Sequence, residues 1–147
     1  MRVSASRIKK TTGTAKLSGL VIVSNAQVKV RLLFVSLILY NAKGLTYSVI
    51  GGWDPKTGEI HQEINAEIDQ AFENVELNLK NAGGKGWEQV FRVNSYHIPL
   101  DNEALAAMVR NFKKWMPGHQ PIWTCVGVPK LGQDAMRVEI EVVAHIP

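Results

Sequence analysis

The sequence predicts an α+β fold in which two helices cover one face of a mixed β-sheet. Two stretches of the chain have apolar residues at the helical spacing of three and four, and the segments around them alternate as strands do. The elements follow in the order β-α-β-α-β-β, which favours one layer of helices on one sheet. With 147 residues, 46% of them hydrophobic, the chain can bury a single core, so we expect one domain.

The beginning of the chain differs in charge from the rest. Residues 1–50 hold eight Lys and Arg and no acid, whereas residues 51–147 hold nine against thirteen Asp and Glu, so the net charges are +8 and −4. Residues 1–16 have the composition of a solvated tail and also of an organellar transit peptide. We expect residues 1–23 to be a basic, disordered tail and the protein to be cytoplasmic, with the mitochondrion as the alternative. Nucleic acids bind basic surfaces, so we expect none on the acidic part.

Residues 24–147 are the predicted domain, and its first segments read as strands. Residues 24–30 are expected to form the opening strand, and the apolar run at 32–40 a buried one. This run has about half the length that a membrane span requires, so we expect no membrane segment.

A turn and an amphipathic helix follow. Asp54, Pro55 and Gly58 have the chemistry of a turn, because Pro presets φ at the second position and Gly tolerates the left-handed conformation. Beyond the turn, apolar residues recur every three or four positions until Gly83, where we expect the helix to end. The members of this stripe are Ile64, Ile68, Phe72, Val75 and Leu79.

Next we predict a strand at residues 87–98 and a second helix. This helix begins after Asp101, a good N-cap residue, and ends at Pro117. Its apolar stripe comprises Leu105, Met108, Val109, Phe112 and Trp115.

Two strands close the chain, and alternation assigns their faces. In residues 122–128, one face carries Ile122, Thr124, Val126 and Val128, and the other Trp123, Cys125 and Gly127. In residues 136–146, we expect a core face of Val138, Ile140, Val142 and Ala144, and an outer face of Glu139, Glu141, Val143 and His145.

The sequence offers no metal or cofactor site. Cys125 is the single cysteine, so no intramolecular disulfide can form, and no Cys or His cluster has the spacing of zinc ligands. The four histidines show no spacing typical of a metal site or a catalytic triad. We therefore expect no metal and no cofactor.

Two segments near the end carry a family resemblance. Residues 120–126 read Gln-Pro-Ile-Trp-Thr-Cys-Val, and residues 137–144 read Arg-Val-Glu-Ile-Glu-Val-Val-Ala. Together with Asn78 and the Ala82-Gly83 pair, they resemble the signature of the Rid family, also called RidA, YjgF or endoribonuclease L-PSP, over about residues 51–147. The resemblance implies a chorismate-mutase-like fold, a homotrimer, and clefts between subunits that bind small molecules.

The resemblance also implies roles for four residues. In the family, an arginine binds the carboxylate of an enamine or imine acid that the protein hydrolyses, and Trp123 stands at its position here. Trp123, Thr124 and Cys125 are thereby implied to contact the ligand, and Glu139 to assist the attacking water as a general base. An indole cannot copy the planar fork of a guanidinium. The candidates for a replacement cation are Arg92, Arg110 and Arg137.

Three of the four site residues also have a simpler explanation. Cys125 fits an inert, partly buried thiol, Trp123 fits interface packing, and Glu139 fits a solvated carboxylate.

The segment 31–50 departs from the family. In its place the family has a Gly-Asp turn and a strand that ends in Ser-Gly-Gln. We hypothesise that residues 31–50, or much of them, come from an altered reading of the gene, such as a retained intron. A transcript that lacks the segment would support this hypothesis.

Three functions from different classes remain open. The first is an enamine or imine hydrolase of the deaminase type with an altered substrate. The second is a non-catalytic trimeric module that binds a ligand or a protein. The third is an endoribonuclease or translation inhibitor, which the acidic charge of residues 51–147 disfavours.

Overall fold

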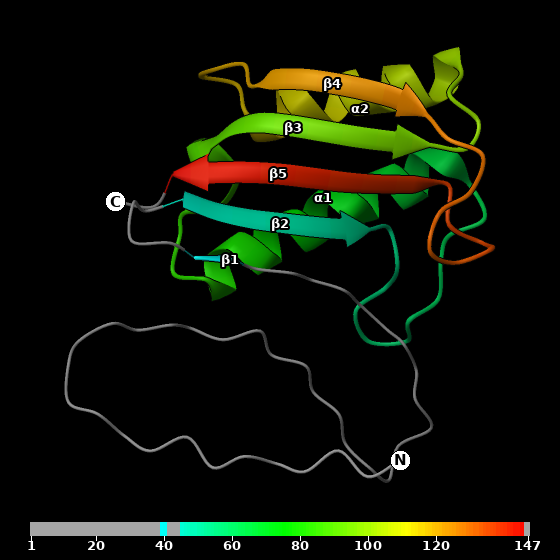
Figure 1. The fold of residues 1–147 in the computed structure, drawn as a ribbon, viewed down its shortest axis with the longest axis horizontal. Coiled ribbons are helices and arrows are strands. Elements are labelled where there is room, and N and C mark those ends of the chain that lie inside the picture. Colours follow the sequence, from blue (N-terminus) through cyan, green and yellow to red (C-terminus); the bar gives the residue numbers. More distant parts are fainter. Residues whose placement is uncertain (1–38, 41–44, 146–147) are drawn as a thin grey trace, which may run out of the picture.

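Two helices pack on one face of a five-stranded mixed sheet in the computed structural model, which describes residues 39–40 and 45–145 (Figure 1). The strands are β1 (Leu39–Tyr40), β2 (Leu45–Gly51), β3 (Val90–His97), β4 (Ile122–Gly127) and β5 (Val138–His145), and the helices are α1 (Ile64–Asn81) and α2 (Asn102–Trp115). The strand order is β1-β2-β5-β3-β4, and only β3 and β4 pair in parallel. The α+β prediction is thus confirmed. We call the covered side of the sheet the helix face and the other side the open face.

Strand β2 is an inner strand. It pairs with β5 from Leu45 opposite His145 to Gly51 opposite Glu139. The side chain of Ser48 is buried, and its Oγ accepts a 2.8 Å hydrogen bond from Nδ2 of Asn78 in α1. Residues 45–50, which lie in the segment hypothesised to come from an altered reading of the gene, therefore belong to the sheet. The predicted strand at 24–30 lies outside the described residues, and of the run at 32–40 only the two residues of β1 are described.

The structure confirms the predicted turn and the predicted helix α1. Oδ1 of Asp54 accepts hydrogen bonds from the backbone N–H groups of Lys56 and Thr57, and Gly58 has φ = 76°. All five residues of the predicted apolar stripe of α1 are buried. The helix is capped by Glu63 and ends just before Gly83, which has φ = 89°.

The strand predicted at residues 87–98 begins three residues later than expected. Gly86–Gln89 form a short 3₁₀ helix, η1, and β3 starts at Val90. The cause is Trp87, whose buried ring stacks on Phe72 with 4.5 Å between centroids while its N–H donates to the Phe72 carbonyl. The chain has to turn into the core there. Gly86, at φ = 86°, permits this turn because it has no Cβ. A Cβ at this position would overlap the Glu76 carboxylate.

Helix α2 has the predicted position but a rotated contact face. Its N-cap is Asp101, whose carboxylate accepts from the backbone N–H of Ala104. Val109 was expected in the buried stripe, but its side chain is 40% exposed. The cause is a polar contact between the helices. Asn111 is buried and donates a 2.6 Å hydrogen bond to Asp69 on α1, and this rotation of α2 turns Val109 outward. The buried residues of α2 are Ala104, Ala107, Met108 and Asn111.

The closing strands confirm the predicted alternation. Val138, Ile140, Val142 and Ala144 are all buried on the helix face of β5. The register of β3 with β4 places Trp123 opposite Val93 and Cys125 opposite Ser95, both buried residues of the helix face.

A buried carboxylate connects α1 to the start of β5. Glu67 is fully buried, and its carboxylate accepts from the backbone N–H groups of Arg137 at 2.8 Å and Val138 at 3.1 Å. The Nε atom of Arg137 approaches the other oxygen at 3.2 Å. Burial raises the pKa of the Glu67 carboxyl group, although these hydrogen bonds oppose the shift. A Cβ at Gly52 would overlap the Glu67 backbone, so the chain before α1 also depends on this contact.

We expect Glu67→Ala to lower the free energy of unfolding by about 2 to 4 kcal/mol, because three donors lose their acceptor at a buried position. Denaturant unfolding followed by tryptophan fluorescence measures this change. Glu73→Ala, at an exposed position of the same helix, is the control, with an expected change below about 0.5 kcal/mol. Equal effects of the two substitutions would contradict the structural role of Glu67.

Candidate functional site

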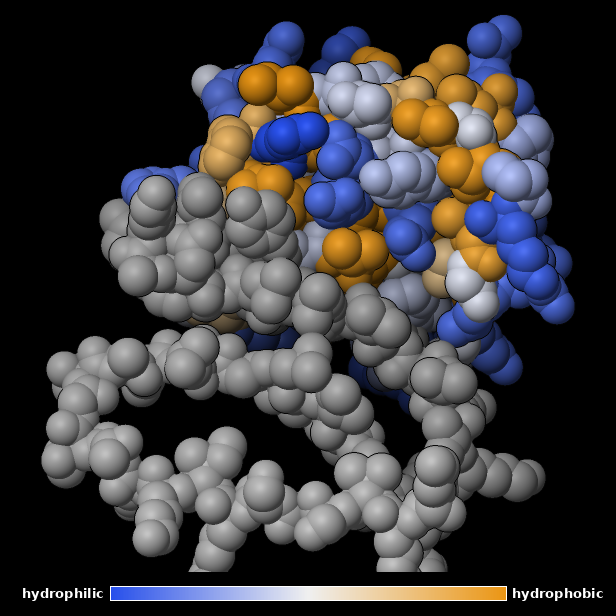
Figure 2. Space-filling view, viewed as in Figure 1, coloured by the Kyte–Doolittle hydropathy of each residue, from blue (hydrophilic) through white to orange (hydrophobic). Residues whose placement is uncertain are grey.

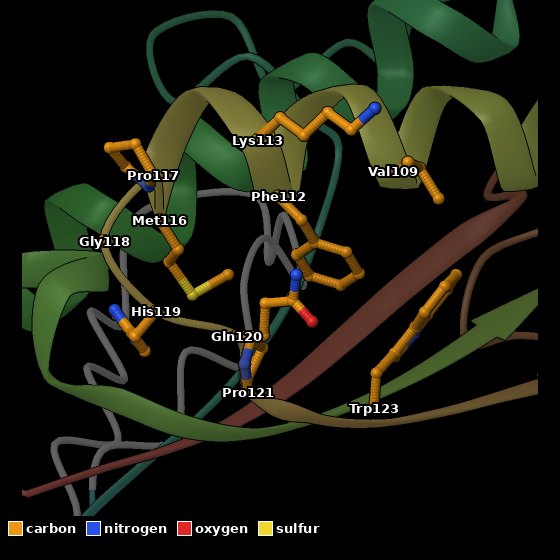
Figure 3. A pocket seen from close by; sticks show the side chains of 10 residues that line it. All are labelled: Val109, Phe112, Lys113, Met116, Pro117, Gly118, His119, Gln120, Pro121 and Trp123. Atoms are coloured by element: carbon orange, nitrogen blue, oxygen red, sulfur yellow. The ribbon is translucent and has the colours of Figure 1, made fainter.

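A groove with a volume of about 610 Å³ lies between the end of α2 and the start of β4 (Figure 3). Helix α2 forms one wall, the loop that follows it forms the end, and Trp123 of β4 forms the opposite wall. The lining residues are Val109, Phe112, Lys113, Met116, Pro117, Gly118, His119, Gln120, Pro121 and Trp123.

Trp123 is held from two sides. Its indole N–H donates to Oγ of Ser95 on β3 at 2.9 Å. Its ring meets Phe112 of α2 edge-on, with 4.9 Å between centroids and 74° between planes, and Phe112 in turn contacts the core residue Phe72. Figure 3 shows the Trp123 ring standing upright from β4 towards α2. The groove therefore has a preformed aromatic wall.

Cys125 belongs to a small polar cluster below this wall. Oγ of the buried Ser95 lies 2.9 Å from Nε2 of the buried His97 and also forms a hydrogen bond with the Cys125 thiol. Burial nevertheless raises the pKa of the Cys125 thiol, and burial lowers the pKa of the His97 imidazole. Both groups are thus kept neutral. This environment does not favour a thiolate nucleophile at neutral pH.

Glu139 and Thr124 lie on the open face. Glu139 is paired with Tyr96 of β3, and Thr124 is paired with Asn94 and exposed. Burial raises the pKa of the Glu139 carboxyl group, and the nearby charge of Glu141 adds to this effect. A carboxyl group with a raised pKa is suited to proton transfer, but here it is separated from the groove by the thickness of the sheet.

The four predicted site residues thus fall into two groups. Trp123 and Cys125 share the helix face at the groove, whereas Thr124 and Glu139 share the open face. Within one chain the fold does not bring all four together. Their ligand and catalytic roles stay predictions.

None of the arginines considered as replacement cations lines the groove. Arg137 pairs with Glu67, Arg110 pairs with Asp69 on α1, and Arg92 is exposed on β3. The groove instead contains Lys113, which the sequence analysis did not single out. Val109 was predicted to be buried, so the spacing of four between Val109 and Lys113 did not indicate a groove, and a lysine in the last helical turn is already explained by the helix dipole.

Two further features are absent from the described part of the chain. No group of three His, Cys, Asp or Glu residues among residues 39–40 and 45–145 could hold a metal ion. No helix in those ranges is long and apolar enough to cross a membrane.

Solved structures share this fold. RidA from an Antarctic Psychrobacter is 27% identical, with a TM-score of 0.64 over 72% of this chain and 84% of that chain. TdcF from E. coli, solved with bound serine, is 20% identical, with a TM-score of 0.65 over 78% of this chain and 91% of that chain.

Sequence comparison identifies the family. No curated protein matches the chain. The family model described as Endoribonuclease L-PSP matches residues 34–146, a range that includes β2 and all elements after it. This match covers well over half of the sequence and agrees with the shared fold. The chain therefore belongs to the endoribonuclease L-PSP family, the RidA/YjgF proteins.

Proposed function

We propose that this protein binds a small organic metabolite in the groove beside Trp123, as a homotrimer, and hydrolyses an enamine or imine other than the short carboxylate-bearing ones. The observation that carries the proposal is Trp123 itself. It stands at the position where the Rid family has its carboxylate-binding arginine, and it forms a wall of the groove.

The environment of Trp123 supports a changed substrate. A guanidinium binds a carboxylate through two parallel hydrogen bonds, whereas an indole has one N–H donor. That donor is already used by Ser95. A carboxylate in the groove would therefore find no hydrogen-bond donor at position 123, and an apolar group would find a flat ring.

A trimer would bring the two halves of the site together. Glu139 is the candidate base, but it lies on the open face, away from the groove. Strand β4 is an edge strand, and its open-face residues Ile122 and Val126 are 69% and 40% exposed. Figure 2, viewed from the open face, shows apolar side chains interspersed with polar ones there. A neighbouring subunit packed along β4 could supply its own open-face groups to the groove.

A non-catalytic ligand-binding module is the second candidate. The neutral state of the Cys125 thiol and the distance of Glu139 from the groove favour it. The acidic charge of residues 51–147 gives no support to ribonuclease activity.

We expect sedimentation equilibrium to return three times the monomer mass of 16.3 kDa. Ile122→Asp should shift the protein towards monomers while circular dichroism stays unchanged, because a charge would be buried at the proposed contact. Leu77→Asp, at a 49% exposed position on α1, is the control and should leave the trimer intact. A monomeric wild type at micromolar concentration would refute the proposed assembly.

We expect wild-type hydrolysis of 2-iminobutanoate to be roughly thirtyfold or more slower than that of an arginine-bearing relative, since a lost charge-assisted pair costs about 2 to 5 kcal/mol. Trp123→Arg should gain this activity, measured with an imine-generating dehydratase. Its rate should rise with pH through the raised pKa of Glu139, because the base acts deprotonated.

Trp123→Met opens the groove without adding a charge and serves as the control for this gain. It should remain inactive. A wild type as fast as the arginine-bearing relative, or equal gains by both variants, would show that residue 123 does not determine the substrate.

A further inference from the structure

We propose that the ligand of the groove carries a flat aromatic ring and one anionic group, with the ring against Trp123 and Phe112 and the anion paired with Lys113. This inference rests on the proposed function and specifies the chemistry of its ligand. Lys113, rather than residue 123, would then determine the charge that the groove selects.

The walls select a ring. Phe112 and Trp123 meet edge-on, so they present two differently oriented aromatic surfaces to a ligand. Figure 3 shows Met116 reaching from α2 into the same space, where its thioether can contact a ring edge. The volume of about 610 Å³ lies within the range of small-molecule pockets and far exceeds what a four-carbon acid would fill. A short acid would leave the aromatic walls in water.

The charge of the lining selects an anion. None of the ten lining residues is acidic, and Lys113 is the one Lys or Arg among them. The ring of His119 is engaged at the edge of the groove, where Nε2 lies 2.8 Å from the Val90 carbonyl oxygen. A cationic ligand would meet the ammonium of Lys113. The negative end of the α2 dipole would favour a cation, but Lys113 and Lys114 in the last turn offset it.

Lys113 and its neighbour Lys114 differ in their contacts. The ammonium of Lys114 lies 4.9 Å from the centroid of the Trp115 ring, a cation–π arrangement. Within the described residues no salt bridge involves Lys113. Figure 3 shows its side chain running along α2, with the ammonium at the edge of the helix that is farther from Trp123 in this view. Its flexible stem allows it to reach an anion at the mouth.

Four small probes separate the ring from the charge. Phenylacetate, 2-phenylethanol and 2-phenylethylamine share a ring and differ in charge, and butanoate has the charge without the ring. We expect the full-length protein, titrated by NMR, to bind phenylacetate about three- to tenfold more tightly than 2-phenylethanol. The amine should bind more weakly than the alcohol. Butanoate should bind at least about tenfold more weakly than phenylacetate.

Two matched variants test the role of Lys113. Lys113→Gln should abolish the preference for phenylacetate over 2-phenylethanol. Lys114→Gln should keep the preference. Both positions are exposed, so both variants should fold. Trp123→Ala should weaken the binding of all three aromatic probes.

The outcomes separate this inference from the proposed function. If 2-phenylethanol binds as tightly as phenylacetate, if Lys113→Gln keeps the preference, or if butanoate equals phenylacetate, the inference is overturned while the groove remains a ligand site. If none of the four probes binds, both the inference and the proposed groove function are overturned.

Discussion

The indole of Trp123 connects the edge strand β4 to helix α2, and the shape of the groove depends on this contact. Its N–H is bound to Ser95 and its ring rests against Phe112, so the side chain cannot turn aside to admit a differently shaped ligand without losing both contacts. Ser95 also contacts His97 and Cys125, so the same hydroxyl group supports the polar cluster below the wall. Trp123 thus determines both the chemistry and the rigidity of this wall of the groove.

The order of the strands explains why one chain alone does not bring Trp123 and Glu139 together. Strand β4 lies at the edge, and β3 separates it from β5, which carries Glu139. Alternation then places Trp123 and Glu139 on opposite faces. The proposed hydrolysis, which uses both residues, therefore relies on the proposed trimer, whereas the proposed ligand binding in the groove involves one chain alone. The proposed binding and the proposed hydrolysis can therefore be tested separately.

Much of the fold could be predicted from the sequence, because the spacing of apolar residues along a helix or strand follows the face that is buried. The stripe of α1 and the inner face of β5 were confirmed for this reason. The turn of Trp87 into the core was missed because alternation does not register a side chain that packs under a helix. For the candidate site, alternation correctly predicted that Trp123 and Cys125 lie on the same face of β4. The sequence did not predict the position of Lys113 at the groove, because that position depends on the rotation of α2 that the hydrogen bond between Asn111 and Asp69 fixes.

Both proposals require that Trp123 forms the wall of the groove that contacts the ligand. Incorporation of 5-fluorotryptophan gives one ¹⁹F resonance for each of the four tryptophans, and Trp123→Phe assigns the one in the groove. Titration with phenylacetate should shift the Trp123 resonance and leave that of Trp87, which is buried beneath α1, unchanged. If phenylacetate binds while the Trp123 resonance stays in place, the ligand site lies elsewhere and Trp123 is not its wall.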